Sequence, residues 1–93
     1  MITRFFKVVS CGNLTYVHSD KADNGQLAKR NIILQEMGGR FADQYLGTLL
    51  GNDANCQFYT GNMVIASLRF ATRNYNGQAY QDIIVADICK LAK

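Results

Sequence analysis

Apolar and polar residues alternate along most of this chain, which is the period of β-strands with one buried face. Five alternating segments predict strands: Phe5–Cys11, Lys29–Met37, Ala42–Leu50, Met63–Tyr75 and Ala79–Leu91. The fourth segment separates into an apolar and a mixed face: Val64, Ala66, Leu68 and Phe70 against Ile65, Ser67, Arg69, Ala71 and Arg73. No long segment has helical periodicity, so the pattern predicts an all-β fold.

A tight hairpin is predicted between the last two segments, at Tyr75-Asn76-Gly77-Gln78. Asn-Gly favours a type I′ turn, because both central residues of that turn have positive φ. The fourth and fifth strands are therefore expected to be antiparallel neighbours.

Two stretches interrupt the alternation. The first strand can continue past Gly12-Asn13 through Leu14, Tyr16 and Val17, with the glycine at a bulge or a bend. The stretch Asn52–Tyr59 has room for a single helical turn between the third and fourth strands. Five short strands, turn signals and one short helix or turn are typical of a small five-stranded barrel.

Composition limits what this barrel can do. Ninety-three residues allow one domain, with 48% hydrophobic and 18% charged residues. The net charge of +3 is compatible with nucleic acid but does not require it. The three cysteines, Cys11, Cys56 and Cys89, have neither disulfide-framework nor zinc-site spacing, so a reducing cytoplasmic location and no cofactor are expected. No apolar run reaches the roughly 20 residues of a membrane span.

The second half of the chain carries a recognisable order of motifs. Leu49-Leu50-Gly51 ends a strand, Tyr59-Thr60-Gly61 precedes the next, and strands at Val64–Tyr75 and Ile83–Leu91 follow. This order resembles the bacterial single-stranded-DNA-binding proteins. The resemblance implies a single OB-fold domain over residues 1–93, non-catalytic binding of single-stranded DNA, and assembly into a dimer or tetramer.

Arginines and tyrosines of the last hairpin are the first candidates for DNA contacts. Arg69 and Arg73 lie on one strand face, about 13 Å apart by strand rise. Guanidinium groups bind phosphates and stack on bases, although a solvated sheet face carries the same residues. Tyr75 corresponds to a stacking tryptophan of the resembled family. It can equally stabilise the turn by cross-strand contact, for example with Tyr80.

Further candidates lie on the second and third strands. Lys29 and Arg30 open the second strand, and OB folds bind oligonucleotides across strands two and three. A basic pair there is also an ordinary solubility feature. Tyr45 neighbours a position that is aromatic in the resembled family, but its register predicts that it faces the opposite side of the sheet. Gln35, Gln44 and Leu50 stand at the family's other stacking positions.

Other functions stay open at this point. An OB module for protein association in a replication or primosome-like assembly fits the same pattern, and so does RNA binding. Enzyme chemistry has little support, because His18 and Asp20 lie in a polar loop and the remaining aspartates show no paired spacing.

Overall fold

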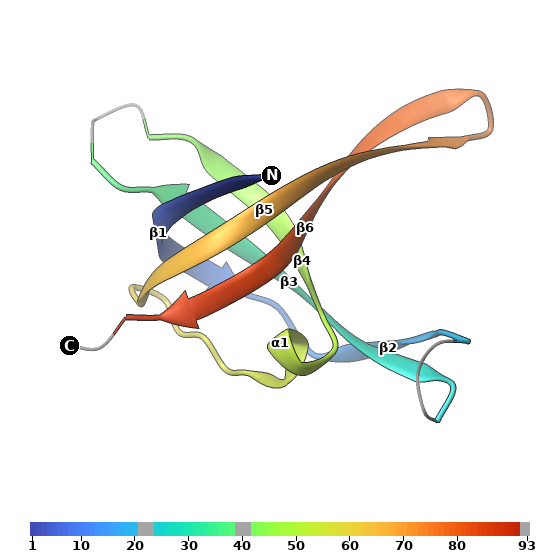
Figure 1. Ribbon diagram of the computed structural model, residues 1–93, viewed down its shortest axis with the longest axis horizontal. Coiled ribbons are helices and arrows are strands. Elements are labelled where there is room, and N and C mark those ends of the chain that lie inside the picture. Colours follow the sequence, from blue (N-terminus) through green and yellow to red (C-terminus); the bar gives the residue numbers. More distant parts are fainter. Residues whose placement is uncertain (21–23, 39–41, 92–93) are drawn as a thin grey trace.

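The computed structural model describes residues 1–20, 24–38 and 42–91 of the chain (Figure 1). These residues form six strands and one short helix. In chain order the elements are β1 (Ile2–Cys11), β2 (Thr15–His18), β3 (Gln26–Glu36), β4 (Gln44–Leu50), α1 (Asn52–Asn55), β5 (Met63–Tyr75) and β6 (Gln78–Lys90).

The strands form one sheet that closes on itself. Their order is β1-β5-β6-β4-β3-β2, and a further pairing of β1 with β3 completes the barrel. The pairs are antiparallel except for a short parallel contact between β4 and β6, where Thr48 lies opposite Ile84. Both β1 and β2 pair with β3, so they are the predicted first strand interrupted at Gly12-Asn13. The prediction of a five-stranded barrel with a short helix after its third strand is confirmed.

The interior consists of the apolar positions that the alternation predicts. The largest fully buried side chains are Phe6, Val8, Ile32, Leu34, Leu49, Val64 and Leu68. Ala54 of α1 is also fully buried, so the helix closes one end of the core. Gly47 allows a close approach of β4 and β6, because a Cβ at this position would lie 3.0 Å from Cγ2 of Val85. Burial of this apolar face is the main stabilising contribution to the barrel.

The hairpin of β5 and β6 projects beyond the barrel (Figure 1). Asn76 and Gly77 have φ values of 52° and 77°, which confirms the predicted type I′ geometry. The pairing of β1 with β5 reaches Leu68 and goes no further in the described residues. Phe70 is predicted on the inner face, but it is 42% exposed. It lies beyond the last residue of β5 that pairs with β1, where the inner face of the hairpin no longer covers the core.

Candidate nucleic-acid interface

An open groove of about 390 Å³ lies on the outer surface of the barrel, between the sheet and the base of the hairpin. Side chains from five strands line it: Val17, Leu27, Lys29, Thr48, Leu50, Arg73, Asp82 and Ile84. On β3 the alternation buries Ala28, Ile32 and Leu34, so Lys29 points outward. The same argument on β4 places Thr48 and Leu50 outward, beside buried Leu49.

The floor of the groove is apolar and its rim is charged. Leu27, Leu50 and Ile84 are only partly exposed and lie where three different strands meet. Lys29 contributes a positive charge from the barrel and Arg73 one from the hairpin, and Asp82 contributes a carboxylate beside Arg73. An apolar floor between two cations matches the two parts of a nucleotide, a flat base and an anionic phosphate.

Arg73 is held in place by two neighbours on the hairpin. Its Nε donates to Oδ2 of Asp82 at 2.8 Å, and its guanidinium carbon lies 5.0 Å from the centre of the Tyr80 ring. Tyr80 is directly opposite Arg73 in the register of β5 and β6. Because Asp82 occupies Nε, the terminal amino groups and the guanidinium face away from Tyr80 are the parts available to a ligand.

Tyr75 lies at the end of the hairpin, on the same strand face as Arg69 and Arg73. Tyr75 is 61% exposed, and its cross-strand partner is Gln78 rather than Tyr80. The Tyr80 hydroxyl donates to Oε1 of Gln78 at 3.0 Å. The Tyr75 ring is thus open to solvent, as a stacking platform requires.

Two of the predicted binding residues lie away from both the groove and the hairpin. Arg30 faces the opposite side of β3 from Lys29, and its Nη1 donates to the carbonyl of Cys56 at 3.5 Å. Tyr45 is half-buried, with its ring edge-on to Phe6 at 5.9 Å between centroids. Its hydroxyl donates to the Glu36 carboxylate, and this hydrogen bond raises the pKa of Tyr45. Of the seven predicted residues, the structure brings Lys29 and Arg73 together in the groove, with Tyr80, Arg69 and Tyr75 on the adjoining hairpin.

Asp82 and the groove floor were not among the predicted site residues. The hairpin turn at Asn76-Gly77 contains the signal that identifies Asp82. A two-residue turn pairs Tyr75 with Gln78, and the same register pairs Arg73 with Tyr80. Asp82 is then the next residue on the same face of β6, beside Arg73. The floor depends on the register between strands far apart in sequence, for which the chain gives no local signal.

Three further observations concern the described residues. They contain no group of three or more His, Cys, Asp or Glu side chains placed to hold a metal ion. No helix within residues 1–20, 24–38 and 42–91 has the length and apolar character needed to cross a membrane. His18 and Asp20 form an exposed pair at 3.0 Å.

Comparison with known proteins supports the fold. No protein-family model matches the sequence, and no curated protein matches it. The structure is similar to the solution NMR structure of the second OB-fold domain of replication protein A from Methanococcus maripaludis, with a TM-score of 0.71. The alignment covers 98% of this chain and 83% of that chain, at 19% sequence identity. The chain has an OB fold.

Proposed function

We propose that this protein binds single-stranded DNA without catalysing a reaction, in the groove between the barrel and the base of the hairpin. The observation that supports this most strongly is the convergence of Lys29 and Arg73 over an apolar floor on the outer face of the sheet. The relation to single-stranded-DNA-binding proteins is part of the same proposal, and the fold similarity to a domain of replication protein A is consistent with it.

The residues of the groove and of the adjoining hairpin have separate roles in this proposal. Lys29, a flexible point charge, contacts phosphate. The Tyr75 ring stacks on a base near the hairpin tip, and Arg73, already backed by Tyr80, stacks on another. Arg69 extends the positive charge along β5. Stacking requires unpaired bases, so the arrangement favours single strands over duplex.

Binding measured by fluorescence anisotropy tests the proposal. We expect labelled oligo-dT to bind at low salt and duplex DNA to bind more weakly. The affinity should fall with salt, with a log–log slope of about −0.7 for each phosphate contacted. Oligo-rU in the same assay shows whether RNA is an equal ligand. Absence of oligo-dT binding at low salt would contradict the proposal.

Failure of that test would favour the second candidate function, binding of a protein partner within a replication or primosome-like assembly. The apolar floor of Leu27, Leu50 and Ile84 is equally suited to side chains of a peptide. The modest net charge of +3 is compatible with either ligand.

We also propose that the protein self-associates as a dimer or tetramer. Ile33 and Ile65, on the outward faces of β3 and β5, are only partly buried within one chain. Full burial of such a side chain contributes roughly 1.5–3 kcal/mol, which an isologous contact obtains twice.

A further inference from the structure

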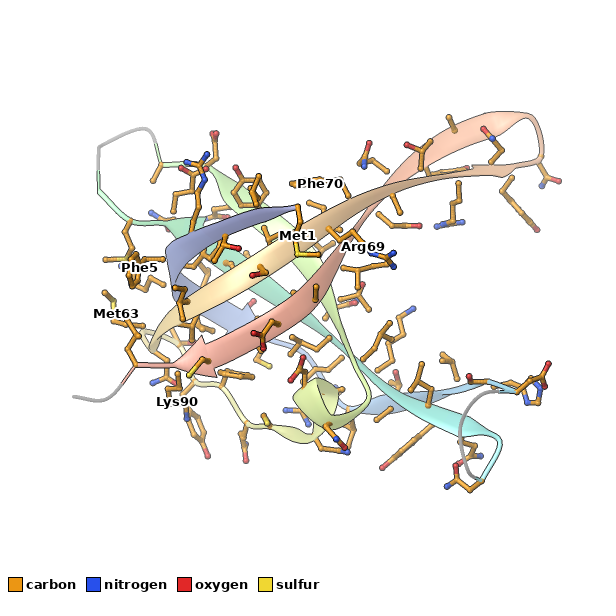
Figure 2. The ribbon with its side chains drawn as sticks, viewed as in Figure 1. Met1, Phe5, Met63, Arg69, Phe70 and Lys90 are labelled. Atoms are coloured by element: carbon orange, nitrogen blue, oxygen red, sulfur yellow. The ribbon has the colours of Figure 1, made fainter. Side chains whose placement is uncertain are left out.

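The outer face of β1, β5 and β6 carries apolar side chains that the barrel leaves uncovered. Phe5, Ile65 and Cys89 lie side by side in register across the three strands. Met63 and Leu91 form the next row, joined by a hydrogen bond from the Leu91 amide to the Met63 carbonyl at 2.9 Å. Phe5 is 55% exposed and Met63 39% exposed, and Figure 2 shows both at the β1 side of the molecule. Apolar patches of this size also occur on monomers, so the polar residues around this one decide whether it fits a partner.

The polar residues of this face are compatible with contact by another surface that excludes water. The hydroxyls of Thr3 and Ser67 bond to each other at 2.7 Å, so both keep a partner when water is excluded. Lys7 and Asp87 lie at diagonally opposite corners, beside Met63 and Ser67 respectively. Strand spacing and rise put these two residues about 16 Å apart, too far for an ion pair within one chain.

We propose that this face binds a second copy of the chain through an isologous contact. The two-fold axis of this contact passes through Ile65 and lies in the plane between the two faces, perpendicular to the line from Lys7 to Asp87. Rotation about it brings Lys7 of each copy opposite Asp87 of the other. The same rotation sets Met63 against Cys89 of the second copy and Ile65 against its equivalent. The strands then cross steeply, near the orthogonal arrangement of stacked sheets.

The size of the face sets the strength of the contact. Three strands and three outward rows cover about 14 by 20 Å, or roughly 280 Å² per copy, from strand geometry. Stable complexes bury about 800 Å² per partner, so the dimer is weak and concentration-dependent. This inference rests on the proposed self-association, and it uses none of the groove residues, of which Ile84 on β6 lies opposite Arg69, one outward row beyond Ser67 and Asp87.

Charge reversal with sedimentation velocity tests the pairing, over concentrations from low micromolar to millimolar. We expect Lys7→Glu and Asp87→Lys each to weaken dimerisation by at least about tenfold, because each creates two like-charge contacts per dimer. An equimolar mixture of the two variants should dimerise at least as well as the unmodified protein, because both contacts are then between opposite charges. The exposed Asn74→Glu, outside this face, is the matched control and should not change dimerisation.

The other possible results would contradict either the proposed face or self-association. Dimerisation of both single variants at unmodified strength, or no recovery in the mixture of folded variants, would overturn the proposed face. A mass of 10.4 kDa throughout the series for the unmodified protein would overturn self-association itself. Neither result bears on DNA binding, which anisotropy measures separately. Circular dichroism of each variant establishes that it is folded.

Discussion

Replacing Tyr75 with alanine should weaken binding of single-stranded DNA by about 1–3 kcal/mol, the usual contribution of one base–aromatic stack. The ring is exposed and its hydroxyl has no hydrogen bond among the described contacts, so the ring face is the feature available to a ligand. Stacking is not ionic, and the salt dependence of binding should therefore stay nearly unchanged. Anisotropy titrations at several salt concentrations measure both quantities.

Tyr75→Phe is the matched control for this prediction, because it keeps the ring and removes only the hydroxyl. It should bind DNA almost as well as the unmodified protein. Equal losses for the Phe and Ala variants would assign the effect to the hydroxyl or to the hairpin turn, and would remove Tyr75 from the stacking role. Thermal melting shows whether either variant alters the fold.

The second large effect is expected from the pair of Arg73 and Asp82. Because the carboxylate already neutralises Arg73 at 2.8 Å, Arg73→Ala should cost affinity through the lost stack and the exposed Asp82 charge. Asp82→Asn should have the opposite effect and strengthen binding at low salt. It frees Arg73 for a phosphate, so the log–log salt slope should become more negative by about 0.7.

Lys29→Ala is the variant against which the salt slope of Asp82→Asn is compared. Lys29 has no carboxylate partner among the described ion pairs, so its loss should make the slope shallower by about 0.7, the value for one phosphate contact. If Asp82→Asn leaves both affinity and slope unchanged, Asp82 does not restrain Arg73 in the bound state. The double variant Arg73→Ala/Asp82→Asn should recover part of the affinity lost in Arg73→Ala.

The elements of this fold could be predicted from sequence because their signals are local. The alternation from Met63 onward identified the buried face of β5, and Asn76-Gly77 identified the hairpin turn. Phe70 departed from the pattern because alternation assigns a face but does not show where the core ends.

The site was predicted less completely, because residues that are adjacent in sequence were treated as one cluster. In a pleated strand, adjacent side chains point to opposite faces of the sheet. Lys29 and Arg30 are adjacent in the chain but face opposite sides of β3, so only Lys29 reaches the groove. Tyr45 was expected to face away from the binding side, and the structure places it against Phe6. The groove floor arises where β4 meets β6, a parallel contact between segments more than 30 residues apart.

The location of the bound strand is the central claim, and NMR chemical-shift mapping tests it most directly. A ¹⁵N-labelled sample titrated with oligo-dT should show its largest amide shifts at Leu27, Lys29, Thr48, Arg73 and Ile84, with further shifts toward Tyr75. Residues around Arg30 and Tyr45, and the outer face at Phe5 and Ile65, should change little. Shifts centred on either of those regions, with the groove unaffected, would contradict the account.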